Sequence, residues 1–391
     1  MQKKQIKELV SKFKDTHFTL RFWDGEEIQV GTPPSQFKVI LNEPIHTMDF
    51  LKSATLAFGQ AYMKGTLDIE GDLYAALNHI LKYKKHFRTS FKLLPNIFRT
   101  STSAKNQKKQ VSSHYDLGND FYRLWLDETL SYSCGYFKKS TDMLYQAQMN
   151  KIHHILHKLN LSEGQSLLDI GCGWGNLLIE AVNLYKVKGL GITLSQEQYD
   201  AFSARIKEEN LTDYLEVRLM DYRELIDSSM EFDRIVSVGM LEHVGRKEYP
   251  TFFNAVDAVL KEEGLMLLHY ISALTESPGD AWIKKYIFPG GVIPSLREII
   301  SLSADHHFYT LDVESLRRHY TNTLLEWHKN FNTVIPEVTQ MFDESFVRMW
   351  HMYLCACAAC FNNGIVDLHQ ILFSKGVNND LPFTREHMYK S

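Results

Sequence analysis

The stretch Leu167–Gly175, LLDIGCGWG, decides the fold of this 391-residue chain. It joins the apolar run Ser166–Ile170 to a loop in which every second residue is glycine. Glycine tolerates positive φ and lets a ligand approach the backbone closely. Ligands of open α/β sheets bind where strands end at their carboxyl edge. We therefore interpret the stretch as a strand followed by a binding loop, with a tight turn that binds nothing as the alternative.

A nicotinamide dinucleotide is disfavoured as the ligand of this loop. Its fingerprint, G-x-G-x-x-G, requires a sixth-place glycine, but Asn176 stands there, and the strand that follows the helix ends at Thr193 with no acidic residue for a ribose. The order D-x-G-x-G-x-G resembles instead the first motif of Rossmann-like S-adenosylmethionine methyltransferases. The segment Phe232–Ser237 lies at the distance that such a fold requires for a later strand.

Apolar runs alternate with helical stretches through the rest of the C-terminal part. This alternation predicts a parallel sheet with helices on both faces. The expected strands are Ser166–Ile170, Val187–Leu194, Leu215–Met220, Arg234–Val238 and Leu265–Tyr270. Residues 336–363 have the periodicity of one long helix that ends near Gly364. Asp367–Ser374 is expected to return as a final strand.

The N-terminal part has a different pattern and predicts a second domain. Residues 16–41 alternate around Asp24-Gly25, a favoured hairpin pair, and residues 47–87 indicate helices interrupted at glycines. Residues 99–112 are polar and basic without apolar periodicity. We therefore expect an N-terminal docking domain at 1–98, a linker at 99–112 and a catalytic domain at 113–391.

Charge is distributed unevenly along the chain. The net charge is -4, yet residues 1–110 carry 18 basic and 10 acidic side chains. Ile6, Leu9, Val10 and Phe13 fall at helical spacing among lysines, and a second basic cluster spans 82–88. This pattern is typical of a stretch that lies on an anionic bilayer, although a solvated basic face has the same composition. No nucleic-acid recognition module is apparent.

Apolar content is 44%, and no apolar run reaches about 18 residues, so no membrane span is expected.

Five cysteines without a disulfide-like spacing fit a reducing cytoplasm. A closed zinc site needs four ligands, and the cluster Cys355, Cys357 and Cys360 offers three, so no metal is expected. A homodimer is left open.

Several blocks together resemble the cyclopropane-fatty-acyl-phospholipid synthases and the related mycolic acid cyclopropane synthases. The resemblance runs from about His114 to Val377, and the N-terminal hundred residues match less distinctly. The blocks are HYDLGND (114–120), YSCGY (132–136), LLDIGCGWG (167–175), GITLSQEQ (191–198), DYR (221–223), FDRIVSVGMLEHVG (232–245), KYIFPGG (285–291) and LFSKGV (372–377). Sister enzymes that methylate mycolic acids, sphingolipids or plant alkaloids share several of them.

The resemblance implies a class I S-adenosylmethionine methyltransferase core with a smaller N-terminal α+β lipid-binding domain. It implies cyclopropanation of unsaturated phospholipid acyl chains, with bound bicarbonate as the base, by an enzyme at the inner surface of the cytoplasmic membrane. The residues that match the family's cofactor site are Tyr132, Ser133, Asp169, Gly171, Gly173, Thr193, Gln198, Asp221 and Tyr222. Those that match its catalytic and bicarbonate positions are Cys134, Glu242, His269, Ile271 (through its backbone), Tyr320 and Cys357.

Two other functions remain open from the sequence. One is a methyltransferase of the same family that makes a methyl-branched lipid or methylates an amine. The other is a lipid-binding protein without catalysis, which the intact glycine loop argues against.

Overall fold

The computed structural model describes residues 3–11, 16–45, 50, 53–83 and 117–389, and the chain divides into two compact units. The smaller unit combines the described part of Met1–Arg99 with Pro278–Ile287 and Leu324–Ile365. The larger unit comprises the described parts of Thr100–Ser277, Phe288–Thr323 and Val366–Ser391. The units are interleaved along the sequence, which differs from the single boundary that we expected. The expected linker at 99–112 lies outside the described residues.

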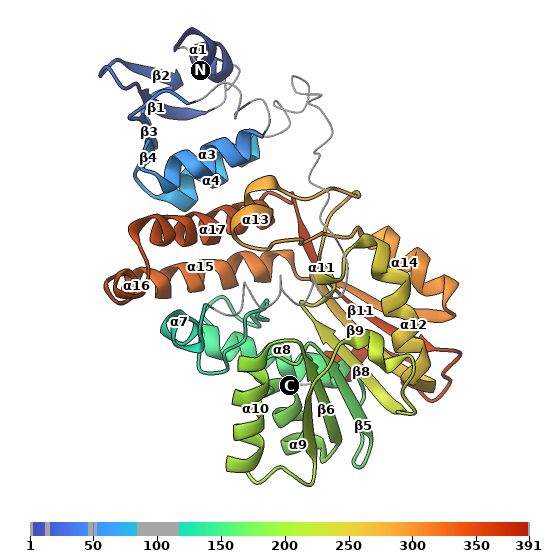
Figure 1. Ribbon diagram of the computed structural model, residues 1–391. Helices are drawn as coiled ribbons and strands as arrows, with labels where there is room; N and C mark the ends of the chain where they lie inside the picture. Colours follow the sequence, from blue (N-terminus) through green and yellow to red (C-terminus); the bar gives the residue numbers. More distant parts are fainter. Residues whose placement is uncertain (1–2, 12–15, 46–49, 51–52, 84–116, 390–391) are drawn as a thin grey trace. The chain divides into compact units, whose positions relative to one another are not determined.

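The larger unit contains a seven-stranded sheet in the order β10-β11-β9-β8-β5-β6-β7 (Figure 1). Its strands are β5 (Ser166–Ile170), β6 (Lys188–Thr193), β7 (Leu215–Leu219), β8 (Phe232–Val238), β9 (Leu260–Ser272), β10 (Phe308–Ser315) and β11 (Asp367–Lys375). The five strands that we expected to be parallel, β5 to β9, pair in parallel. The final strand that we expected at Asp367–Ser374 is confirmed as β11. The expected parallel sheet is extended at one edge by two antiparallel strands: β11 runs antiparallel to β9, and the unforeseen strand β10 runs antiparallel to β11.

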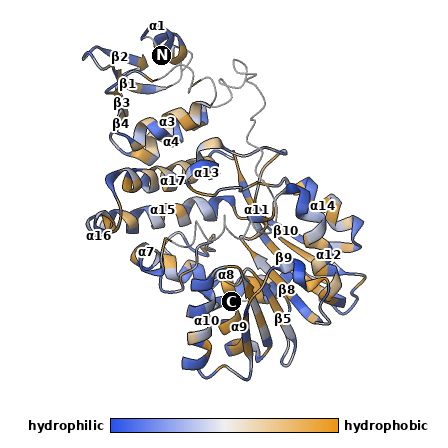
Figure 2. Cartoon of the chain, viewed as in Figure 1, coloured by the Kyte–Doolittle hydropathy of each residue, from blue (hydrophilic) through white to orange (hydrophobic). Residues whose placement is uncertain are grey.

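Helices cover both faces of this sheet because neighbouring strand residues point to opposite sides. Leu167 packs in a core with α8 (Leu144–Lys158), α9 (Asn176–Tyr185) and α10 (Gln196–Glu208). Leu168 packs in a second core with α12 (Tyr249–Val259) and α14 (Leu296–Asp305). Figure 2 shows apolar residues along the strands and on the helices beside them. The unit also contains α7 (Asn119–Trp125), η1 (Tyr222–Leu225), α11 (Leu241–Val244), η2 (Arg246–Glu248), η3 (Arg385–Tyr389) and the first part of α15 (Arg317–Thr333).

The smaller unit contains a four-stranded sheet in the order β2-β1-β3-β4. Its strands are β1 (His17–Arg21), β2 (Glu27–Gly31), β3 (Phe37–Leu41) and β4 (Leu67–Glu70). The hairpin expected around Asp24-Gly25 is confirmed, since β1 and β2 pair antiparallel. Besides the second part of α15, the helices of this unit are α1 (Lys3–Val10), α3 (Ala54–Met63), α4 (Leu73–Lys82), α13 (Ala281–Tyr286), α16 (Ile335–Met341) and α17 (Glu344–Asn362).

Two sequence expectations in this unit are corrected. The segment 47–87 is not helical throughout, because the short strand β4 lies between the two glycine interruptions and pairs with β3. The helix expected over 336–363 is two helices, α16 and α17. They separate at Phe342 and Asp343, whose extended backbone allows the Asp343 side chain to accept a hydrogen bond from the N–H of Phe346 at 2.8 Å. Apolar periodicity continues across such a break, so spacing alone could not reveal it.

Candidate active site

The glycine loop after β5 opens into a pocket in the larger unit. Three of its glycines have positive φ: Gly171 (+87°), Gly173 (+56°) and Gly175 (+86°). Gly175 also begins α9, where an added Cβ would lie 2.1 Å from the ring of Phe202. At Gly173 no protein atom would lie within 4 Å of an added Cβ. The loop therefore exposes backbone to the pocket, as the sequence predicted.

Eight of the nine expected cofactor residues line this one pocket. They are Tyr132, Ser133, Asp169, Gly171, Gly173, Thr193, Gln198 and Tyr222. They come from the ends of β5 and β6, from α10 and η1, and from the loop before α8. The carboxyl ends of neighbouring parallel strands meet at one sheet edge, which explains why residues so far apart in sequence converge.

The ninth residue, Asp221, is not among the pocket-lining residues. Its carboxylate caps η1 by accepting the N–H of Arg223 at 3.0 Å, and it also binds the Arg223 guanidinium at 2.8 and 2.6 Å. Its neighbours Met220 and Tyr222 do line the pocket. The structure therefore shows a local capping role for Asp221, and its contact with the cofactor remains a prediction.

The side chains of Thr193 and Gln198 hold each other at the end of β6. The Thr193 hydroxyl donates to Gln198 Oε1 at 2.8 Å and accepts the N–H of Ser195 at 3.2 Å. Ser195 in turn caps α10, by accepting the N–H of Gln198 at 3.4 Å. This cap fixes one wall of the pocket to a rigid helix start.

The aromatic helix α7 supports the Tyr132 side of the pocket. The Tyr132 ring lies 5.4 Å from Tyr122 and 5.5 Å from Trp125, both fully buried. The pocket-lining Trp174 donates its indole N–H to Asn119 at 2.9 Å. The block 114–120 therefore contributes support through its described residues, whereas 114–116 lie outside the described part of the chain.

Two buried side chains of opposite charge also line the pocket. Asp169 is 3% exposed, and burial raises its pKa to about 7, opposed by the positive charge of Lys151. Lys151, on α8, is 4% exposed, and burial lowers its pKa to about 8. Sequence reasoning missed Lys151. The helical spacing of the core residues Ile152, Ile155, Leu156 and Leu159 was the available signal, because position 151 lies one turn before Ile155.

The residues expected around a catalytic base are connected through the backbone of β8, β9 and β11. Glu242 is partly buried on α11, and its Oε1 accepts the N–H of Ile271 at 2.6 Å. The main-chain donor assigned to bicarbonate is therefore already bonded to Glu242. The other oxygen, Oε2, is buried without a hydrogen-bond partner among the described residues, and burial raises the Glu242 pKa to about 7.

His269 lies two residues before Ile271 on β9 and is 1% exposed. Gln370 donates to its Nδ1 at 3.2 Å, which leaves the proton on Nε2. Within the described chain this Nε2 has no partner. Burial is the first cause that lowers the His269 pKa, to about 3, so the imidazole is neutral.

The thiol of Cys134 and the backbone N–H of Tyr320 both lie against the carbonyl oxygen of Leu316. The Cys134 thiol lies 3.9 Å from the carbonyl oxygen of Leu316, which also accepts the N–H of Tyr320 at 3.0 Å. Leu316 donates to Leu368 at 2.8 Å, and Leu368 pairs with Ile271 across β11 and β9. Cys134 is fully buried, and burial raises its pKa, so the thiol stays protonated.

Cys357 belongs to the smaller unit, on α17, and burial raises its pKa well above the ordinary value. A nucleophilic cysteine needs a lowered pKa, so the local environment gives no support to a catalytic role.

The same helix also carries His351 and Cys355, whose potential donor atoms lie within 4.8 Å of each other and of a donor atom of His328 on α15. The two imidazole rings are stacked with 4° between their planes and 4.7 Å between centroids. A metal ion binds in the plane of an imidazole, and parallel planes share no point. This arrangement therefore could hold an ion only after one ring rotates.

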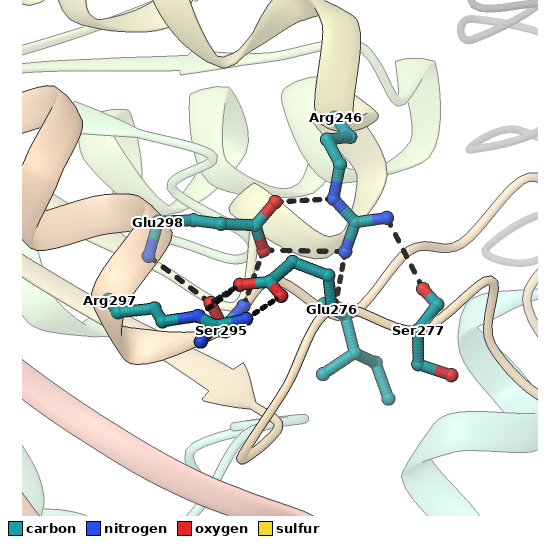
Figure 3. Close-up of polar contacts among 7 residues, drawn as sticks. Arg246, Glu276, Ser277, Ser295, Arg297 and Glu298 are labelled. Carbon is teal, nitrogen blue, oxygen red and sulfur yellow. Dashed lines mark hydrogen bonds and ion pairs between the residues drawn. The ribbon is translucent and has the colours of Figure 1, made fainter.

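A polar network fixes the segment that follows β9 (Figure 3). Arg246, the first residue of η2, donates to Glu298 at 2.5 Å and to the carbonyl oxygens of Ser277 and Ile293, both at 3.3 Å. Glu276 binds Arg297 and accepts the hydroxyl of Ser295 at 2.7 Å. Together with the hydrogen bond from Val292 to the Glu242 carbonyl oxygen at 3.0 Å, the network holds α11 and its carboxylate in place.

Comparison with known proteins agrees with this geometry. A family model described as mycolic acid cyclopropane synthetase matches residues 102–371, and a model for a domain of unknown function matches residues 5–92. A probable fatty acid methyltransferase of Pseudomonas putida is 36% identical over 95% of this chain and 96% of its own length. The cyclopropane-fatty-acyl-phospholipid synthase of Escherichia coli K12 is 38% identical over 91% of this chain and 92% of its own length.

A crystal structure of the mycolic acid cyclopropane synthase CmaA1 complexed with SAH and CTAB superposes with a TM-score of 0.65. It is 33% identical and covers 68% of this chain and 98% of its own. The sheet and its glycine-loop pocket define an S-adenosylmethionine-dependent methyltransferase. More narrowly, the chain belongs to the mycolic acid cyclopropane synthetase family.

Proposed function

We propose that this enzyme transfers a methylene group from S-adenosylmethionine to the cis double bond of unsaturated phospholipid acyl chains, forming a cyclopropane ring. The observation that carries the proposal is the pocket in which eight expected cofactor residues converge. The near full-length similarity to a cyclopropane-fatty-acyl-phospholipid synthase supports the substrate class.

For this reaction the protein must position the two reactants, exclude water and hold a base near the added methyl group. S-adenosylmethionine supplies an electrophilic methyl group, and an isolated alkene is a weak nucleophile, so the protein must position the two closely. Attack leaves a positive charge on the neighbouring carbon, so water must be excluded. Loss of a proton from the added methyl group then closes the ring, which requires a base held nearby.

The group around Glu242 offers partners for a small anionic base such as bicarbonate. The free Nε2–H of His269 can donate to the ion, and the free Oε2 of Glu242 can accept its hydroxyl hydrogen. Donors and acceptors without partners in a buried place are costly unless a bound group satisfies them. The residues present therefore fit bicarbonate, although the Ile271 N–H would have to leave Glu242 to take part.

Glu242 itself is the rival base. A carboxylate with a pKa near 7 and a free oxygen could accept the proton directly. Because its pKa is raised, the ionised form predominates only above about pH 7. In that case activity should rise as the pH increases through this value.

Substitution of Glu242 by glutamine separates these two roles. If the carboxylate only positions bicarbonate, the variant keeps reduced activity that rises with added bicarbonate, and removal of dissolved carbon dioxide slows the unmodified enzyme. Glu231→Gln, an exposed change outside the pocket, is the control. Full activity without bicarbonate, together with an inactive Glu242→Gln at every bicarbonate concentration, would make Glu242 the base.

The second candidate function is transfer of a methyl group without ring closure. The similarity to a probable fatty acid methyltransferase over almost the whole chain favours it. Incubation with unsaturated phospholipid vesicles and labelled cofactor, followed by nuclear magnetic resonance of the released acyl chains, distinguishes the two. Ring protons are expected, and a methyl branch without a ring would contradict cyclopropanation.

We further propose that the enzyme is cytoplasmic and acts at the inner membrane surface. In the described part of the chain, no helix has both the length and the apolar character to span a bilayer. Its substrate would have to be reached by docking from the aqueous side.

A further inference from the structure

Two lysines on α8 are equally buried but differ in how their charge is balanced. Lys158 is fully buried and forms ion pairs with Asp312 at 3.1 Å and Glu314 at 2.5 Å. Lys151 lies two turns earlier and is 4% exposed. Its Nζ donates to the Ser133 hydroxyl at 3.1 Å, but no carboxylate of a described residue comes within ion-pair distance.

This difference matters because an ammonium group is costly to bury without an opposite charge. The cost appears as a pKa of Lys151 lowered to about 8 by burial, which the negative charges of Asp127 and Asp169 only partly oppose. Lys158 shows that the same helix can balance a buried cation from within the protein. Lys151 lines the cofactor pocket, whereas Lys158 does not.

A structural role in holding the neighbouring loop would not require this lysine. Gln148 already donates to the carbonyl oxygens of Ser131 and Ser133, at 3.3 and 2.9 Å. A neutral donor at position 151 would serve the Ser133 hydroxyl as well as an ammonium group does. The positive charge of Lys151 therefore indicates that an anionic group of the bound ligand balances it.

S-adenosylmethionine carries one anionic group, the carboxylate of its methionine part, beside an ammonium group. The pocket contains one side chain of the opposite charge for each of these two groups. Lys151 supplies a buried cation, and Asp169 supplies a buried carboxyl whose Oδ1 has no hydrogen-bond partner among the described residues. We infer that Lys151, with the Ser133 hydroxyl, binds the carboxylate of the cofactor's methionine part. The inference rests on the cofactor assignment and is independent of the lipid substrate and of bicarbonate.

Binding of two cofactor fragments tests this inference. S-adenosylhomocysteine retains the carboxylate, whereas 5′-methylthioadenosine lacks the whole amino-acid part. Lys151→Met and Lys151→Gln should each weaken S-adenosylhomocysteine binding about 10- to 100-fold, as expected for a lost charged hydrogen bond. Both should leave the affinity for 5′-methylthioadenosine within about twofold. Lys186→Met, an exposed change on the same unit, is the control.

Calorimetry at pH 8 in two buffers of different ionisation enthalpy gives a second readout. A carboxylate that binds the ammonium form raises the pKa of Lys151, so the unmodified protein should take up about half a proton more than Lys151→Met. The ligand's own amino group titrates in both proteins, and the difference removes its contribution.

Each outcome has one meaning. Equal losses for both fragments, a Lys151→Gln that binds S-adenosylhomocysteine normally, or equal proton uptake in variant and parent would overturn the role of Lys151. If the unmodified protein bound neither fragment, the cofactor assignment itself would fail. Cooperative thermal unfolding of each variant establishes that it is folded.

Discussion

The three glycines of the loop after β5 are required for different reasons. At Gly175 a side chain would collide with Phe202, so helix packing excludes it. At Gly171 an added Cβ would lie 3.2 Å from Met240, a flexible neighbour. At Gly173 the protein leaves open space for an added Cβ, and because this residue lines the pocket, a side chain there would enter the space of a bound ligand. Positive φ adds a smaller requirement at all three positions.

Gly173→Ala should therefore impair binding more than folding. We expect S-adenosylhomocysteine affinity to fall about 10- to 100-fold, because the methyl group enters the ligand space, at a cost like that of overpacking. Unfolding free energy should fall only by about 1 kcal/mol, from the left-handed backbone. Gly164→Ala is a matched control, since Gly164 also has positive φ and open surroundings but lies outside the pocket. Equal affinity losses in both variants would refute a direct contact at Gly173.

At the scale of elements, the structure differs from sequence expectation where a local hydrogen bond overrides periodicity. Residues 336–363 keep a helical apolar repeat, yet the chain turns at Asp343 to begin α17 anew. The side chain of Asp343 satisfies a backbone N–H that would otherwise lack a partner at the helix start.

Asp343→Ala should lower the free energy of unfolding by about 1 kcal/mol, the usual cost of losing an N-cap. Asp343→Ser should retain most of the stability, because serine caps as well. Urea unfolding followed by circular dichroism measures both. An alanine variant as stable as the serine variant would mean that packing alone fixes the break between α16 and α17.

At the scale of the whole molecule, charge along the chain bears on how a bilayer is reached. Some lysines of the N-terminal part are already engaged in ion pairs: Lys3 and Lys7 pair with Glu26, and Lys3 also pairs with Asp24. Lys4 and Lys82 are exposed and form no ion pair with any described residue. Phe13 and the cluster from residue 84 to 88 lie outside the described residues.

We predict that Lys4→Glu combined with Lys82→Glu weakens co-sedimentation with anionic vesicles about tenfold or more at low salt. Each basic residue near such a surface contributes about 1 kcal/mol, and salt screens the attraction. Lys186→Glu with Lys188→Glu reverses two exposed charges of the larger unit and serves as the control. Substitutions are preferable to a truncation at residue 113, because the smaller unit also includes Leu324–Ile365. If the control weakened binding equally, N-terminal docking would be wrong.

The sequence by itself determined the parallel strands, the cofactor loop and eight of the residues that line the pocket. These features depend on short-range patterns: apolar runs, strand ends and glycines whose chemistry is local. It could not reveal β10, the interleaving of the two units, the ion pair that occupies Asp221, or that Lys151 and Asp169 line the same pocket. Those features depend on which segments meet in space, and the same lysine is an ordinary surface residue until a sheet covers it. Only the tertiary structure decides whether a buried charge finds its partner inside the protein, as Lys158 does, or leaves room for a ligand, as Lys151 does.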